Sequence, residues 1–398
     1  MQIPRWARLA SAVLAVSLVA AACGGDDSEG SSATTAAEGD GSATTAAGGA
    51  GGEDSPTNLA GVCPSRIVVQ TDWHAEAEHG GLYQMLGDDY DVDTNNYKSI
   101  GPLMAGDVDT GVEIEIREGG PAIGFEQVSA TMYKDESIHL GYVSTSEAVQ
   151  QAEQLPTVGV MAPFEKNPQI LMWDPATYPD VNTIADLGAK NILVRYFADA
   201  TYIAYFVATG VLQESQLDSS YDGTPAVFVS EGGKIAQQGF ASAEPYIYMN
   251  EVEAWHKPVK FQLVHDAGFQ SYSQTMAVRA GDLEELTPCL EKFVPIMQQA
   301  QVDYLGDPAR SIEVILDLTE SFDDGWQYSQ GVAEFSVEQQ EELGIVDNGP
   351  DATLGNFDEA RVQEVINLLA PLEGFAVAKN VKPADVMTNE FIDESIGL

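Results

Sequence analysis

Residues 67–83 read Ile67-Val-Val-Gln-Thr-Asp-Trp-His-Ala-Glu-Ala-Glu-His-Gly-Gly-Leu-Tyr83. The first four are mostly β-branched, which is typical of a buried strand, and a short polar loop follows them. From Glu78 to Leu86 the pattern indicates a helix. Asp72 and Trp73 therefore lie at the carboxyl end of a strand, where open α/β sheets bind their ligands.

The same alternation continues along the chain. Strands are expected at 112–117, 138–142 and 157–162, and helices near 125–132 and 146–154. A second run of short strands and helices follows, so the sequence predicts an α/β protein with two lobes. The expected boundaries are 63–168 for the first part of lobe 1, 169–268 for lobe 2, and 269–398 for the return to lobe 1 and the C-terminal helices.

The C-terminal part is expected to be mainly helical. Thr287 and Pro288 suit the N-cap and first turn of a helix, and Pro295 should kink that helix. Four apolar residues at helical spacing predict a core-facing stripe on a later helix: Val362, Val365, Ile366 and Leu369.

The N-terminal residues predict an export signal. Arg5 and Arg8 precede an apolar run from Leu9 to Ala22, which is too short to span a bilayer, so 1–22 is expected to be a signal peptide. The end of the run resembles a bacterial lipoprotein box, which implies a lipid on Cys23. An ordinary secretory cleavage site is the alternative. We therefore expect the protein at the outer face of the cytoplasmic membrane, held by its lipid.

A flexible linker is expected at 23–62, because 24–58 consists almost entirely of Gly, Ser, Ala, Thr, Asp and Glu. Beyond the linker, Cys63 and Cys289 remain. Outside the cytosol, such a pair favours a disulfide, with two buried free thiols as the alternative.

The chain of 398 residues is strongly acidic. It holds 62 Asp and Glu against 18 Lys and Arg, a formal net charge of −44. Phosphate backbones and anionic headgroups would be repelled, so nucleic acid is excluded as an expected partner.

Six segments, in order, resemble one family: 70–83, 112–121, 138–146, 184–194, 243–246 and 266–269. The chain resembles, over about 64–320, the substrate-binding proteins of ABC importers for sulfonates, nitrate and thiamine pyrimidine precursors. The likeness implies a type II periplasmic-binding-protein-like fold with hinge strands, a small-molecule ligand, and a permease with its ATPase as partners. It implies no catalysis and no cofactor, and we expect a monomer. An acidic stretch at 87–111 departs from the family and is expected to reshape the binding mouth, and the likeness fades after residue 322.

The resemblance and the strand ends together suggest the binding residues. They are Asp72, Trp73, His79, Tyr83, Ser144, Arg195, Asp199, Thr201, Glu244 and Tyr246. Trp73 and Tyr83 would stack on a flat ring, with a place in the core as the alternative for Tyr83, which is at helical spacing with Leu86. His79 would bind ligand or cap the helix, Asp199 and Thr201 would cap or bind, and Glu244 would be a ligand acceptor or a solvated carboxylate. Arg195 could meet an anion or pair with a local carboxylate.

We favour a flat nitrogen heterocycle as the ligand, such as a thiamine pyrimidine precursor, because aromatic residues and carboxylates outnumber basic groups among these candidates. A sulfonate or nitrate is the second possibility. A metal-binding protein or a pyrimidine-synthesising enzyme is the alternative of another class. The sequence lacks the Gly-x-Ser-x-Gly, Walker and HExxH motifs. His74 and His79 would lie about 140° apart on a helix and would share a metal only from a loop, so no metal site is predicted.

Overall fold

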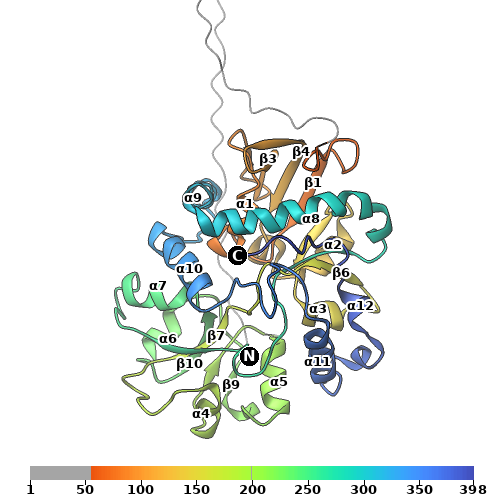
Figure 1. Ribbon diagram of the computed structural model, residues 1–398. Helices are drawn as coiled ribbons and strands as arrows, with labels where there is room; N and C mark the ends of the chain where they lie inside the picture. The colour runs from red at the N-terminus through yellow and green to blue at the C-terminus, as the bar shows by residue number, and fades with distance from the viewer. Residues whose placement is uncertain (1–54, 199) are drawn as a thin grey trace, which may run out of the picture. The chain divides into compact units, whose positions relative to one another are not determined.

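Two β-sheets organise the chain in the computed structural model, which describes residues 55–198 and 200–398. The predicted signal peptide 1–22, the lipidation site Cys23, most of the linker and Asp199 lie outside these described residues. No described helix is both long and apolar enough to cross a membrane. The expected two-lobed α/β architecture is confirmed, with one sheet at the centre of each lobe (Figure 1).

The first lobe contains a seven-stranded sheet in the order β2-β3-β4-β1-β5-β12-β6. Its central strand β1 runs parallel to β4 and β5, whereas β12 is antiparallel to both β5 and β6. The strands are β1 Arg66–Gln70, β2 Asp91–Asp93, β3 Lys98–Ala105, β4 Val108–Arg117, β5 Leu140–Val143, β6 Thr157–Met161 and β12 Thr275–Arg279. The acidic stretch 87–111 forms β2, β3 and the turn into β4 at one edge of this sheet.

The second lobe contains a five-stranded sheet in the order β11-β7-β10-β8-β9. Strand β7 is antiparallel to β10 and β11, and β8 is parallel to β10 and β9. The strands are β7 Gln169–Trp173, β8 Val194–Arg195, β9 Leu217–Asp218, β10 Ala236–Phe240 and β11 Lys260–Leu263. The chain passes between the two sheets at 162–168 and again at 264–274, which we call the crossing segments.

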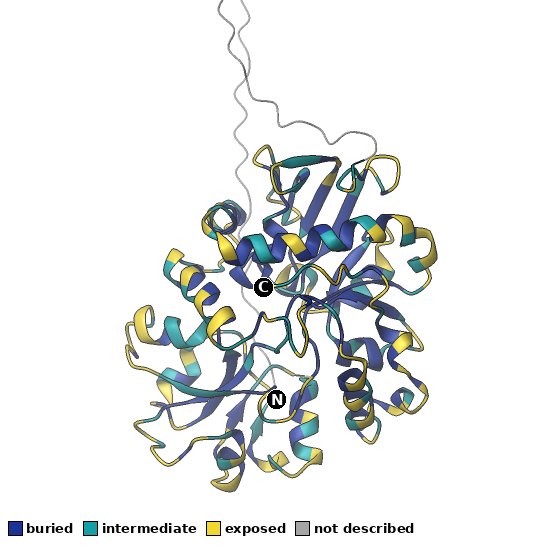
Figure 2. Ribbon diagram, viewed as in Figure 1, coloured by how far each residue is buried: buried dark blue, intermediate teal, exposed yellow. Residues whose placement is uncertain are grey.

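Helices flank both sheets. They are α1 Gly80–Tyr83, α2 Val128–Lys134, α3 Thr145–Gln150, α4 Ile184–Ala189, α5 Thr201–Ala208, α6 Ala226–Ser230, α7 Glu244–Asn250, α8 Leu283–Gly306, α9 Ala309–Phe322, α10 Gln330–Glu342, α11 Glu359–Leu369 and α12 Pro383–Val386. In Figure 1 the long helix α8 runs across the strands of the first lobe. Figure 2 shows the strands buried and the outer helix faces exposed, as expected of layers that share a core.

The helix predictions differ from the structure in their bounds: α2 covers Val128–Lys134 and α3 covers Thr145–Gln150, where 125–132 and 146–154 were expected. The stretch 78–86 holds only a 3-10 turn at Ala77–His79 and the single α-turn of α1. Helix α8 begins at Leu283, five residues before Pro288, the first helical residue of the prediction. Thr287 does not cap it, because its hydroxyl donates instead to the Leu283 carbonyl at 2.8 Å. Glu284 and Glu285 in the first turn favour the earlier start through the helix dipole.

The predicted stripe on α11 is confirmed, because Val362, Val365, Ile366 and Leu369 are all buried. They belong to a core cluster that also contains Trp173 of β7 and Tyr272 of the second crossing segment. The C-terminal helices therefore pack into the core and complete it, although the family likeness does not extend to them.

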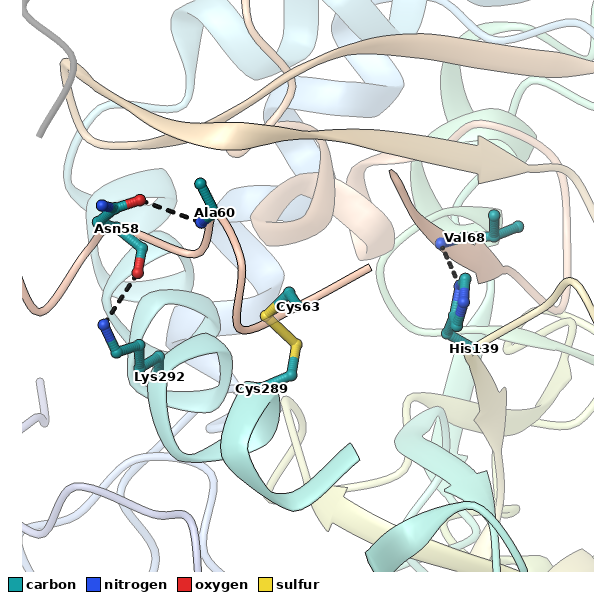
Figure 3. The surroundings of a disulfide bond; sticks show 7 residues. All are labelled: Asn58, Ala60, Cys63, Val68, His139, Cys289 and Lys292. Atoms are coloured by element: carbon teal, nitrogen blue, oxygen red, sulfur yellow. Dashed lines mark hydrogen bonds between the residues drawn. A yellow bond between two sulfur atoms is a disulfide. The ribbon is translucent and has the colours of Figure 1, made fainter. Parts of the chain in front are cut away.

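The predicted disulfide joins Cys63 to Cys289, whose Cα atoms are 4.6 Å apart (Figure 3). Cys63 precedes β1, and Cys289 lies in the second turn of α8. Next to the bridge, Lys292 donates to the carbonyl of Asn58 at 2.9 Å. The start of the described chain is thus fixed to α8 both covalently and by hydrogen bonds.

Candidate functional site

A cavity of about 200 Å³ lies between the two lobes. The loop after β1, strand β10, the start of α7 and the segment after α9 all reach it. Its lining consists of Asp72, Trp73, Glu76, Gln169, Phe197, Tyr221, Gly223, Gln238, Gly239, Phe240, Ala243, Glu244, Gln274 and Trp326. The cavity therefore lies at the carboxyl end of β1, where the sequence predicted ligand binding.

Two glycines hold the loop after β1 in place. The Gly119 backbone N–H donates to the Trp73 carbonyl at 2.9 Å, and a Cβ on Gly119 would lie 2.2 Å from the Thr71 carbonyl oxygen. Gly120 has φ +54°, and a Cβ there would be 2.7 Å from the Trp73 ring. Only residues without a side chain allow this approach. The Gly-Gly pair after β4 thus sets the position of the indole in the cavity.

Aromatic rings form much of the cavity wall. The Trp73 ring centre is 5.9 Å from Phe125, 5.9 Å from Phe197 and 6.1 Å from Trp326. Phe197 is in turn 4.8 Å from Tyr221. These separations and the tilted or T-shaped angles are those of favourable aromatic pairs. The resulting wall suits a flat, polarizable ligand.

His79 and Gln274 orient the Asp72 carboxyl group. Its Oδ1 lies 3.0 Å from His79 Nε2 and accepts from Gln274 Nε2 at 3.0 Å. His79 is fully buried, stacks on Tyr142 and lies outside the lining of this cavity. It also makes no side-chain cap on α1. The structure thus places His79 as a support for Asp72, a role that neither sequence alternative foresaw.

Glu244 begins α7 and lies over Gly239, where a Cβ would be 2.7 Å from the carboxyl carbon. Its Oε2 accepts from the Phe240 backbone N–H at 2.6 Å. Burial raises the pKa of Glu244 to about 7. Burial, and then the neighbouring carboxylates of Glu78 and Asp72, raise the pKa of Glu76 well above its ordinary value. Both carboxyl groups therefore keep their protons to a higher pH than an exposed glutamate does.

A second cavity of about 330 Å³ shares Asp72, Gln169, Phe197, Gln238, Phe240 and Gln274 with the first, so the two are parts of one cleft. Ser144 and Thr201 line it. The Ser144 hydroxyl caps α3 by accepting from the Glu147 N–H at 3.1 Å. Thr201 is the first residue of α5 and makes no capping hydrogen bond, because Ala200 occupies the N-cap. Burial raises the pKa of Glu147, also in the lining, to about 7.

Two aromatic residues that were predicted to bind the ligand, Tyr83 and Tyr246, do not line the cleft. Tyr83 is 1% exposed in the first-lobe core, the alternative that its helical spacing left open. Tyr246 packs on Phe335 of α10, with ring centres 5.5 Å apart.

Arg195 also lies outside the lining, and it is buried and held by the end of β9 and the residues that follow it. Its Nε donates to the Ser220 hydroxyl at 3.3 Å, and its nitrogens lie within 4 Å of Asp218 and Asp222. It pairs with local carboxylates, which was the second interpretation that the sequence left open for this residue.

The charge of the cleft is distinctive. Among the described residues that line either cavity, none is Lys, Arg or His. The acidic stretch 87–111 contributes nothing to this lining, so the expectation that it reshapes the binding mouth was wrong. Its strands instead extend the far edge of the first sheet.

Sequence reasoning missed most of the lining residues, and four of those missed are Gln169, Gln238, Phe240 and Trp326. Gln169 begins β7, whereas Gln238 and Phe240 lie in β10, which is antiparallel to β7 and places Phe240 opposite Gln169. The three residues therefore meet only through the order and direction of the strands. Trp326 follows α9, beyond the part of the chain that resembles the family. The turn-forming run Asp323-Asp-Gly-Trp326 was its only local signal.

The sequence matches no family model. No curated protein matches it either.

Solved structures do show a likeness. The alkanesulfonate-binding protein of Xanthomonas axonopodis pv. citri, bound to MOPS, is 12% identical with a TM-score of 0.53 over 82% of this chain and 98% of that one. The periplasmic nitrate-binding protein of Synechocystis is 10% identical, with a TM-score of 0.51 over 82% and 87%. The ligand-binding component of an ABC-type import system from Staphylococcus aureus, with zinc bound, is 10% identical at 0.50 over 82% and 97%. The chain therefore has the fold of periplasmic binding proteins.

Proposed function

We propose that this protein is an extracytoplasmic solute-binding protein of an ABC importer, tethered by a lipid on Cys23, and that its ligand is a flat nitrogen heterocycle such as a thiamine pyrimidine precursor. The fold supports the first part, because two lobes that face a shared cleft can close on a ligand and carry it to a permease. The composition of the cleft supports the second.

The observation that carries the ligand assignment is a cleft lined by aromatic rings and carboxyl groups, with no basic side chain among its described lining residues. Trp73, Phe197 and Tyr221 provide faces for stacking. Asp72 and Glu244 provide acceptors for amino groups or ring N–H donors. A heterocycle that carries such donors uses both features at once.

The carboxyl groups disfavour an anion. A sulfonate or nitrate in this cleft would face Asp72, Glu76 and Glu244 without a compensating cation among the described lining residues. Arg195, the basic residue that the sequence offered for an anion, is engaged with Ser220, Asp218 and Asp222. Each of these carboxyl groups would repel the anion in its ionised form.

Thermal unfolding with two ligand sets tests the proposal. We expect the aminopyrimidine precursor of thiamine to raise the melting temperature in a concentration-dependent way, and alkylsulfonates and nitrate to leave it unchanged. Stabilisation by alkylsulfonates but not by the pyrimidine would refute the heterocycle. Native mass spectrometry of the purified protein provides an independent check, because a tightly bound ligand can be retained and its mass identified.

A matched variant links the result to the cleft. Glu244→Gln keeps the size of the side chain and its acceptor for the Phe240 N–H but removes the charge that the carboxyl group carries above about pH 7, so binding is measured at about pH 8. We expect it to weaken pyrimidine binding about tenfold, in line with the loss of a charge-assisted hydrogen bond. Glu253→Gln, an exposed carboxylate away from the cleft, should not change it.

A further inference from the structure

Three potential metal ligands from distant parts of the chain meet beside the cleft. His74 lies in the loop after β1, Glu118 directly follows β4, and Asp324 follows α9. One ligand atom from each residue lies within 4.8 Å of the other two. His74 Nδ1 is 2.9 Å from Asp324 Oδ2 and 3.7 Å from Glu118 Oε2.

Backbone hydrogen bonds orient both carboxylates toward the histidine. Glu118 Oε1 accepts from the Ala75 N–H at 2.7 Å, and Asp324 Oδ1 accepts from the Trp326 N–H at 3.0 Å. In each case the other oxygen faces His74 Nδ1. Ligands of protein metal sites are typically held by such outer hydrogen bonds. The arrangement is therefore built by the fold, not by chance contact of mobile side chains.

The facing atoms of His74 and Glu118 are buried and make no hydrogen bond, although both contact charged groups of the cluster. The side chains of His74 and Glu118 are 6% and 3% exposed. Among the described residues, neither His74 Nδ1 nor Glu118 Oε2 has a hydrogen-bond partner. Two carboxylates and an imidazole that converge in a poorly solvated place carry a desolvation cost. A bound cation would offset that cost.

We propose that His74, Glu118 and Asp324 bind one divalent transition-metal ion, with Zn²⁺ as the best match. One imidazole nitrogen and two carboxylate oxygens are ligands that zinc accepts, and water would complete a tetrahedral site. The Asp324 side chain is 12% exposed in a residue that faces solvent, which gives an ion a route of entry.

The site would connect two walls of the cleft. His74 stacks on Trp326 with ring centres 4.7 Å apart and planes 6° apart. Asp324 and Trp326 belong to the same turn, while Trp73 precedes His74 in the loop after β1. A bound ion would therefore fix the segment that carries Trp326 to the loop that carries Trp73. This inference concerns the metal alone and does not depend on which solute the cleft binds.

Calorimetric titration of the chelator-treated full chain with ZnCl₂ tests the site, with Co²⁺ absorption in the visible range as a second readout. We expect one ion per chain. His74→Phe, which preserves a ring against Trp326, and Asp324→Asn should each weaken binding at least about 100-fold, the upper end of the loss that supporting residues alone produce. His256→Phe, which alters an exposed histidine elsewhere, should leave the affinity unchanged.

Circular dichroism of each metal-free variant establishes that it is folded before titration. One-to-one binding that is lost in both variants and retained in the His256 variant supports the site. If the unaltered chain does not bind one ion, the proposal is overturned. A loss of stability in His74→Phe would not change this conclusion, because His74 would then serve only as an ion-pair partner. Binding of equal strength in folded His74→Phe and Asp324→Asn also overturns it, since the ion would be held by other surface carboxylates.

Discussion

The guanidinium of Arg361 lies 3.7 Å from the centre of the Tyr272 ring, and its Nη1 donates to Glu165 Oε1 at 2.9 Å. Glu165 belongs to the first crossing segment and Tyr272 to the second, where the Gln270 carbonyl also accepts from Arg361 Nε at 2.7 Å. Arg361 itself is in the first turn of α11. One side chain of the C-terminal helices therefore joins both connections between the lobes.

Replacement of this arginine should destabilise the fold. Arg361→Met retains much of the aliphatic volume but leaves the Glu165 carboxylate and the Gln270 carbonyl without their donor. The Arg361 side chain is only 9% exposed, so we expect a loss of roughly 2–4 kcal/mol in the free energy of unfolding, measured by urea denaturation.

Lys257→Met provides the matched control. The Lys257 ammonium lies 4.3 Å from the Trp255 ring centre but is on an exposed residue, so its removal should change stability by less than about 1 kcal/mol. Equal effects of the two substitutions would show that the contacts of Arg361 in the crossing segments contribute no special stability.

The disulfide should matter because it closes a long loop. Cys63 and Cys289 are 226 residues apart, for which chain-entropy arguments give an upper, model-dependent value of about 5 kcal/mol. We expect the double variant Cys63→Ala/Cys289→Ala to unfold at lower urea, with roughly 2–5 kcal/mol lost. Addition of a reductant should destabilise the unaltered chain but not the double variant. A reductant effect of the same size on both proteins would contradict this account.

The sequence predicted the strands around Trp73 because their periodicity and flanking loops are local signals. The disulfide was also predictable, since the two cysteines beyond the linker had only each other as partners. The start of α8 could not be predicted from the sequence. Thr287-Pro288 is a good start signal on its own, but the chain is already helical from Leu283, and Thr287 then bonds within the helix.

The cleft was predicted less completely, because its residues meet only through tertiary structure. Arg195 could not be assigned until the loop after β9 brought Ser220 and Asp222 to it. Likewise, nothing local in the sequence indicates that Asp324 lies beside His74, because 250 residues separate them and the intervening chain passes through both lobes. Strand order and lobe crossing decide such contacts, and neither can be read from spacing.

The same substitution at two tryptophans should separate binding from stability. Trp73 lines the cleft, whereas Trp173 of β7 is fully buried in the core. We expect Trp73→Leu to weaken binding of the aminopyrimidine precursor by about 10–100-fold with little change in stability, because it removes a stacking face. Trp173→Leu should cost roughly 2–4 kcal/mol of stability through the cavity it leaves. Its effect on affinity should stay within about twofold, as measured by calorimetry on folded protein. Weaker binding in Trp173→Leu alone would contradict the assignment of the cleft.

The raised pKa of Glu244 predicts a specific dependence of stability on pH. Burial raises this pKa from 4.5 to about 7, so between these values the folded chain holds a proton that the unfolded chain has released. Stability contributed by this proton is complete below pH 4.5 and is lost as the pH rises through 7. Glu147, with the same direction of shift, should act in the same sense.

The amide that Glu244→Gln introduces cannot titrate. The free energy of unfolding of this variant should therefore rise relative to that of the unaltered chain by on the order of 2 kcal/mol between about pH 5 and pH 8. Urea unfolding at intervals of about one pH unit measures the difference, and Glu253→Gln gives the baseline for removal of an exposed acidic side chain. Stability curves of Glu244→Gln and the unaltered chain that run parallel across this range would show that the Glu244 carboxyl is ionised throughout, and the cleft would then carry its full negative charge at neutral pH.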